Sequence, residues 1–227
     1  VLMINPFIEG KEKISGAGLC YLFAKCLSHE NRNLANFAVI GMVGDVLEQD
    51  IGRVYDEIIK DSETLVRRGL LIYPSTRPLN RALEYSSSPY IPNVTGSFKG
   101  VIEVLREAKI SKNNGSYKSI CELTDEEMGN LITALMLRSE GKVDSSKLIG
   151  NIYLVKFYNK QEDARELSAL INACSRMGHP WVALGFCLGN KKYREEAEEI
   201  YRDYKQHLVS ALKYVSMQTK FQGKNIQ

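Results

Sequence analysis

The sequence predicts a predominantly helical protein, in which the edge of an α/β domain is followed by a mainly α-helical region. Three observations support this fold class: apolar residues recur at helical spacing along most of the chain, strand-like runs are short, and most of the six prolines gather in residues 74–97. We divide the chain into residues 1–48 (the end of the α/β domain), 49–96 (a connector helix and proline-rich linker) and 97–227 (a helical region).

The N-terminal elements follow from apolar runs and the residues that stop them. Residues 1–4, "VLMI", are a strand ended by Asn5 and Pro6. Two apolar helices at 15–28 and 33–44 lie beside it. An amphipathic helix at 53–68, "RVYDEIIKDSETLVRR", and a short strand, "LLIY", come next.

The remaining elements are helices separated by loops. Thr124 with Glu127 three residues later forms a capping box, which begins a helix ending near Gly141. "NIYLVKF" fits either a strand or the end of a helix. We further expect a short helix at 79–85 and longer ones at 97–108, 161–177 and 191–214.

Composition excludes several classes of protein. With 227 residues, 44% hydrophobic and 25% charged, the chain has ample material for a globular core. A net charge of +3 neither demands nor excludes a phosphate-bearing partner. Five cysteines without a C-x-x-C pair do not make a closed disulfide framework, so we expect a cytoplasmic location. No apolar run reaches membrane-spanning length, and no membrane partner is expected.

Asp45 is the first candidate site residue. It ends the apolar segment "NFAVIGMVGDV", where a carboxylate near the core needs a partner such as a metal ion. Asp45 with Glu48 three residues later equally fits a helix N-cap. Gly44 would let a ligand or another backbone come close.

Arg176, His179 and Ser15 are candidate phosphate-binding residues. Arg176 and His179 lie in "NACSRMGHP", where they suit either a helix C-terminus or an anion contact, since the guanidinium fork matches phosphate oxygens. Ser15 opens "SGAG", which fits a phosphate-cradling helix start or close packing of small residues. No Walker loop, H-E-x-x-H or zinc spacing occurs.

The order of longer motifs adds a family resemblance. "INPFIEGKEKISGAGLCYLFAK", "NLANFAVIGMVGD", "TRPLNRALEYSSSPYIPNVTG", "LTDEE", "KLIGNIYL", "DARELSALINACSRMGHP" and "GFCLGN" follow one another along essentially the whole chain. This order resembles archaeal RecJ-like, GINS-associated nucleases of the DHH phosphoesterase superfamily, which are related to a subunit of the eukaryotic replicative helicase.

The resemblance implies a site and its cofactors. In that family an α/β domain binds two divalent cations, Mn²⁺ or Mg²⁺, and Asp45 corresponds to the last carboxylate ligand, where the cation would offset a near-buried charge. The Asp-His-His motif and the C-terminal G-G-G-H motif of the DHHA1 domain do not occur here. The chain therefore resembles the middle portion of such a protein, with residues 1–48 ending the DHH-type catalytic domain.

The function implied is hydrolysis of phosphodiester bonds by a single-strand-specific exonuclease in DNA replication and repair. Two alternatives remain open: a non-catalytic replisome adaptor that binds GINS, and a phosphodiesterase acting on short oligonucleotides. The partners implied are single-stranded DNA or RNA, the GINS complex and the MCM helicase.

The 227-residue chain alone should not cleave DNA or RNA in the presence of Mn²⁺, because one carboxylate cannot hold a two-metal site. An assay of the purified chain with labelled single strands checks this. Metal-dependent turnover would show that the catalytic residues lie within these 227 positions.

Overall fold

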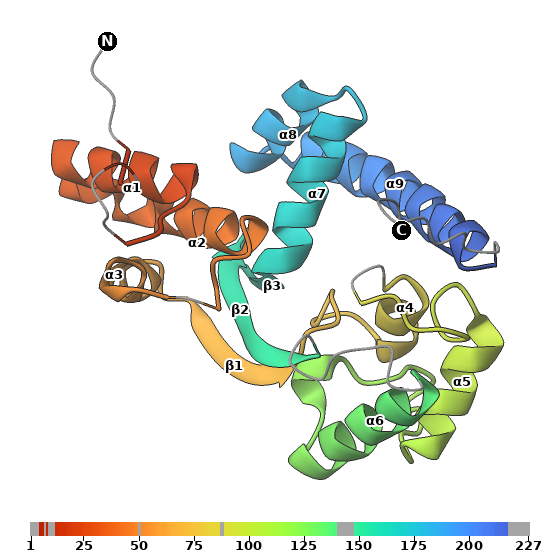
Figure 1. The fold of residues 1–227 in the computed structure, drawn as a ribbon. Helices are drawn as coiled ribbons and strands as arrows, with labels where there is room; N and C mark the ends of the chain where they lie inside the picture. Colours follow the sequence, from red (N-terminus) through yellow and green to blue (C-terminus); the bar gives the residue numbers. More distant parts are fainter. Residues whose placement is uncertain are drawn as a thin grey trace, which may run out of the picture.

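The computed structural model describes residues 5, 6, 8, 12–49, 51–86, 89–139 and 148–217. About 59% of the described residues are helical, so the predominantly helical fold is confirmed. The predicted strand at 1–4 lies outside the described residues. Two hydrophobic cores are joined by a small sheet (Figure 1). In the part of the chain described, no helix combines the length and apolar character needed to cross a membrane.

The first core combines N-terminal and C-terminal helices. Small residues bring two of them together, because a Cβ on Gly41 would press against Ala17 of the preceding helix. The "SGAG" segment therefore provides small residues for close helix packing. The elements are α1 (Gly16–Leu27), the 3₁₀ helix η1 (His29–Leu34), α2 (Ala35–Gly44), α3 (Arg53–Asp61), α7 (Ala164–Arg176), α8 (Pro180–Cys187) and α9 (Lys191–Met217).

The second core is built by residues inserted between two strands of the sheet. Its helices are α4 (Leu79–Glu84), α5 (Phe98–Glu107), the 3₁₀ helix η2 (Ile120–Glu122) and α6 (Asp125–Arg138). The predicted capping box of α6 is confirmed. Glu127 N–H donates to Thr124 Oγ1 at 3.2 Å, and Thr124 N–H donates to Glu127 Oε2 at 2.9 Å.

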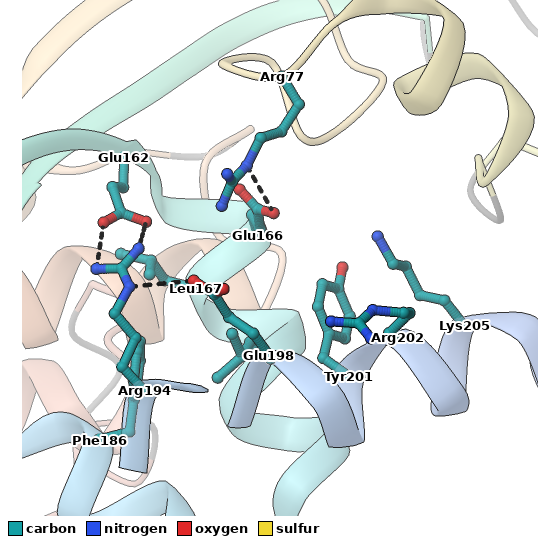
Figure 2. A pocket seen from close by; sticks show the side chains of 11 residues that line it. Arg77, Glu162, Glu166, Leu167, Phe186, Arg194, Glu198, Tyr201, Arg202 and Lys205 are labelled. Carbon is teal, nitrogen blue, oxygen red and sulfur yellow. Dashed lines mark hydrogen bonds and ion pairs between the residues drawn. The ribbon is translucent and has the colours of Figure 1, made fainter. Parts of the chain in front are cut away.

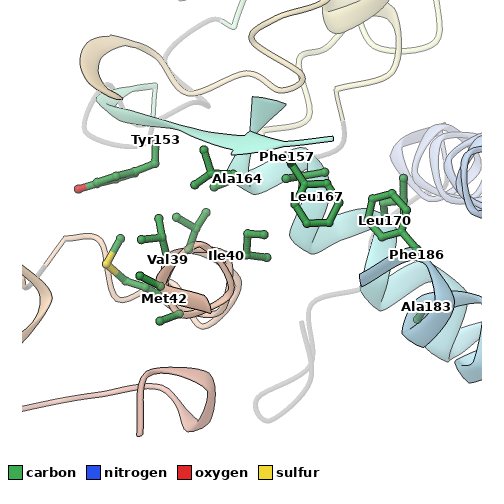
Figure 3. Close-up of a cluster of buried hydrophobic side chains, with 14 of the residues drawn as sticks. Val39, Ile40, Met42, Tyr153, Phe157, Ala164, Leu167, Leu170, Ala183 and Phe186 are labelled. Atoms are coloured by element: carbon green, nitrogen blue, oxygen red, sulfur yellow. The ribbon is translucent and has the colours of Figure 1, made fainter. Parts of the chain in front are cut away.

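The sheet is antiparallel, with strands in the order β1 (Leu65–Leu70), β2 (Ile149–Phe157) and β3 (Lys160–Asp163). Side chains of β2 alternate between the two cores. Ile152 and Leu154 enter the second core, whereas Tyr153, Val155 and Phe157 enter the first. Figure 3 shows Phe157 beside Leu167 of α7. A strand has two faces, so β2 serves as a wall common to both cores.

Two predicted helices are shorter than expected, and their ends are strands. The helix predicted at 53–68 ends at Asp61; Glu63 then takes a left-handed φ of 53°, and Leu65–Leu70 pairs with β2 instead. The helix predicted at 161–177 begins only at Ala164, because Lys160–Asp163 pairs with the end of β2. "NIYLVKF", left open above, is a strand.

The cores group residues differently from the predicted ranges. Residues 49–96 contribute α3 to the first core and α4 to the second, and residues 97–227 are likewise shared between both. Residues 12–48 are helical where they are regular, and the strand that α2 contacts is β2, far along the chain.

Two glycine substitutions should separate crowding from helix propensity. A Cβ on Gly100, in the first turn of α5, would clash with the carbonyl oxygen of Asn93, whereas one on Gly129, in α6, would meet nothing. Gly100→Ala should lower the free energy of unfolding by about 1–3 kcal/mol, and Gly129→Ala should raise it by about 0.5–1 kcal/mol. Urea unfolding measures both, and equal effects would contradict the packing described.

Candidate functional site

Two adjoining pockets of about 180 and 360 Å³ share four lining residues and form one groove along α9. The smaller pocket lies between α9 and α7, and the larger lies between α9 and residues 74–85. Asp163 at the end of β3 sets the geometry of the groove. One carboxylate oxygen accepts from the Arg165 N–H at 2.9 Å and caps α7; the other accepts from the Ser75 N–H at 2.9 Å. The buried Asp163 thereby holds the start of α7 beside the segment that carries Arg77. The residues common to both pockets are Arg77, Glu166, Arg202 and Lys205.

Glu166, in the first turn of α7, lies at the base of this groove. Its Oε1 lies 3.5 Å from Arg77 Nε, and its buried Oε2 has no hydrogen-bond partner among the described residues. Burial raises the pKa of the Glu166 carboxyl to about 7, while the nearby charges of Arg77 and Lys205 oppose the rise. Near neutral pH this carboxyl is therefore present in both protonation states.

The opposite wall is the face of α9 that carries Tyr201, Arg202 and Lys205 (Figure 2). The Lys205 ammonium lies 4.5 Å from the ring centroid of Tyr201 and 5.6 Å from that of Tyr85. Burial lowers the pKa of the Lys205 amine. Within the described ranges, Arg202 has no carboxylate within 4.0 Å, so its guanidinium is open to a ligand.

Arg194 closes the inner end of the groove but is already fully engaged. It forms a two-point ion pair with Glu162, at 2.7 and 3.0 Å, and a third contact with Glu198 at 3.0 Å (Figure 2). This pair ties β3 to α9. The cations that face the groove with fewer internal contacts are Arg77, Arg81, Arg202 and Lys205.

Asp45 is not the near-buried carboxylate that was expected. It is the exposed C-cap residue of α2, and the N-cap alternative is also wrong, since no helix begins there. Glu48 pairs instead with Arg165, and the close approach at Gly44 comes from Ser168 of α7. Among the described residues, no group of three or more His, Cys, Asp or Glu could hold a metal ion. These residues alone therefore do not fit a two-metal centre.

Ser15 has a structural role. It caps α1 by accepting from the Gly18 N–H at 3.1 Å, and its buried hydroxyl also accepts from the Tyr55 hydroxyl at 2.7 Å. A phosphate would have to displace Tyr55 to reach it. Packing and capping therefore account for this residue.

Arg176 and His179 lie together on the surface where α7 turns into α8, away from the groove. Arg176 Nε donates to Asn172 Oδ1 at 3.2 Å, and the His179 N–H donates to the Cys174 carbonyl at 2.8 Å. Arg176 is ten residues beyond Glu166 on one helix, which is about 15 Å along its axis. The sequence analysis missed the groove because Arg202 and Lys205 sit in a helix so rich in both charges that they resemble an ordinary solvated face.

Comparisons with known proteins agree with this architecture. Residues 72–149 match the DHH-CID domain, a domain associated with the DHH superfamily, and these are almost the residues inserted between β1 and β2. The match supports a relation to DHH phosphoesterases.

A curated relative covers nearly the whole chain. The uncharacterized protein MJ0831 of Methanocaldococcus jannaschii is 24% identical in an alignment 224 residues long, which covers 96% of this chain and 49% of that protein. The chain thus spans about half the length of this relative.

Glu166→Gln should remove a pH dependence of stability. With a raised pKa, the folded state binds more protons than the unfolded state between about pH 4.5 and pH 7, so stability is lost as the pH rises through this window. At pH 8 the variant should be more stable than wild type, by at most about 3 kcal/mol; at pH 5 the difference should be much smaller.

Glu199→Gln, on the exposed side of α9, removes the same charge without burial and is the matched control. Urea unfolding at both pH values measures the effect. A stability difference between Glu166→Gln and wild type that does not change with pH would contradict the burial argument.

Proposed function

We propose that this chain is part of a RecJ-like phosphodiesterase of the DHH superfamily that hydrolyses single-stranded DNA or RNA with Mn²⁺ or Mg²⁺ in DNA replication and repair. The observation that carries the proposal is the DHH-CID match, which falls on a separately packed insertion. The motifs from "NPF" to "GFCLGN" support it outside residues 72–149.

We assign to the described residues the role of binding the nucleic acid strand. Asp45 alone does not make a metal site, so further ligands would come from elsewhere in a protein of the relative's length. The groove supplies what a phosphodiester chain needs, since several cations face a shallow channel.

An adaptor that binds GINS or the MCM helicase is the second candidate. Exposed apolar side chains on α8 and at its C-cap favour it: Trp181 is 75% exposed, Leu184 50% and the C-cap residue Leu188 76%. They recur at helical spacing along one helix, and clustered apolar surface is typical of protein-binding sites.

The test uses the complete protein with end-labelled single strands and Mn²⁺. Single strands should be shortened, and Asp45→Ala should reduce the rate at least about 100-fold, because Asp45 would help to hold a metal ion that would supply the activation of water. Asp203→Ala, an exposed acid of α9, is the control. The melting temperature of both variants should stay within a few degrees of wild type.

Other results of this test would favour one of the alternative functions or contradict the role of Asp45. Cleavage of dinucleotides but not of longer strands would favour the short-oligonucleotide phosphodiesterase. Absence of hydrolysis, together with retention of the cognate GINS complex in a pull-down, would favour the adaptor. Full activity of Asp45→Ala would contradict the metal-ligand role.

A further inference from the structure

Three buried polar atoms of residues that line the groove have no hydrogen-bond partner within the described part of the chain. Oε1 of Glu162 lies 2.7 Å from Arg194 in an ion pair, which leaves Oε2 of Glu166 and the hydroxyl oxygen of Tyr201. Both residues line the smaller pocket, Glu166 from α7 and Tyr201 from α9. Because buried polar atoms are nearly always paired, the two atoms indicate a ligand between the two helices. An oxygen of that ligand can accept from the Tyr201 hydroxyl, and also from the Glu166 carboxyl when this group is protonated.

The charges around these atoms define the ligand further. Arg77 reaches the pocket from one wall, and Arg202 and Lys205 reach it from the other. Glu166 is the one acidic residue common to both pockets, and burial raises its pKa to about 7, so it carries less than a full negative charge near neutral pH. The surroundings therefore favour an anion over a cation.

We propose that this groove binds the backbone phosphates of a single-stranded nucleic acid, with Arg77, Arg202 and Lys205 as the charged contacts and Tyr201 and Glu166 as hydrogen-bond partners. The charges of the groove indicate that the ligand is a phosphate-like anion. That the phosphate belongs to a nucleic acid strand rests on the proposed function. The two pockets adjoin at Arg77, Glu166, Arg202 and Lys205, so that one strand can place neighbouring phosphates in both.

Aromatic residues in the groove suit bases as well as phosphates. Tyr85, at the end of α4, lines the larger pocket and is half-buried. A base can stack on such a ring without regard to its identity. Lys205 already holds Tyr85 and Tyr201 near each other through contacts to both rings.

Protonation of Glu166 couples binding to pH. The charged groups that face it are Arg77 before α4, Lys205 on α9, and the acids Asp163 and Glu162 of β3. A neutral Glu166 can donate a hydrogen bond to a phosphate oxygen, whereas an ionised one repels it. A phosphodiester keeps its charge through neutral pH, so a change in affinity there reports on the protein.

The first experiment measures binding of a fluorescent oligothymidylate to the 227-residue chain, without metal, by anisotropy. The double variant Arg202→Gln/Lys205→Gln should weaken binding at least tenfold and reduce the slope of log K against log salt by about 1.4, since each lost phosphate contact on a single strand contributes about 0.7. Lys99→Gln/Arg106→Gln on α5 removes equal charge from exposed positions outside the groove, and should change affinity less than threefold.

The second experiment tests whether protonation of Glu166 strengthens binding of the oligothymidylate. For wild type, the neutral fraction of Glu166 rises from about one tenth at pH 8 to about nine tenths at pH 6, so affinity should rise up to about tenfold. Glu166→Gln should bind equally at both pH values. A pH dependence that survives in Glu166→Gln would overturn the role of this carboxyl.

Two further results would overturn the site itself. Equal weakening in the groove and control double variants would assign binding to diffuse surface charge. Binding of inorganic phosphate without binding of the oligothymidylate would leave a small-anion pocket and refute the strand. Either result is independent of hydrolysis, because the assay contains no metal and measures no cleavage.

Discussion

The antiparallel pairing of β1 with β2 is the contact on which the rest of the structure depends. Leu65 lies opposite Leu154, so the pairing closes a loop of nearly the entire second core. Both faces of β2 are buried, one in each core, and each core loses a wall if the strand moves. Because strand side chains alternate, a shift of register by one residue would send Tyr153 and Phe157 to the wrong core.

The groove is a consequence of this shared wall. β3 continues from β2, and Asp163 at its end both caps α7 and binds the backbone of Ser75. One buried carboxylate thus fixes the distance between the helices of the first core and the Arg77 segment attached to the second. Arg194, held by Glu162 and Glu198, fixes α9 from the other side. Glu166 lies between these two anchors with one oxygen left unpaired.

Local signals were sufficient for most helices. The box of Thr124 and Glu127 marked the start of α6, and the apolar spacing marked α1, α2 and α5. The strand at Leu65–Leu70 was beyond such signals. Its residues continue the amphipathic pattern of α3, and only the distant β2, with the left-handed turn at Glu63, makes them extended.

Sequence alone determined the helical class and the capping box of α6, because both depend on residues close together in the chain. It also showed an order of motifs that resembles that of DHH phosphoesterases. Tertiary structure decided the candidate site. Arg77, Glu166 and Lys205 come from three distant segments, and their meeting is set by the packing around β2 and β3. Tertiary structure also decided that Asp45 is exposed and that the Ser15 hydroxyl accepts a hydrogen bond from Tyr55. Burial is a property of the packed chain, and it is burial that raises the pKa of Glu166 and makes the groove distinct from the charged surface around it.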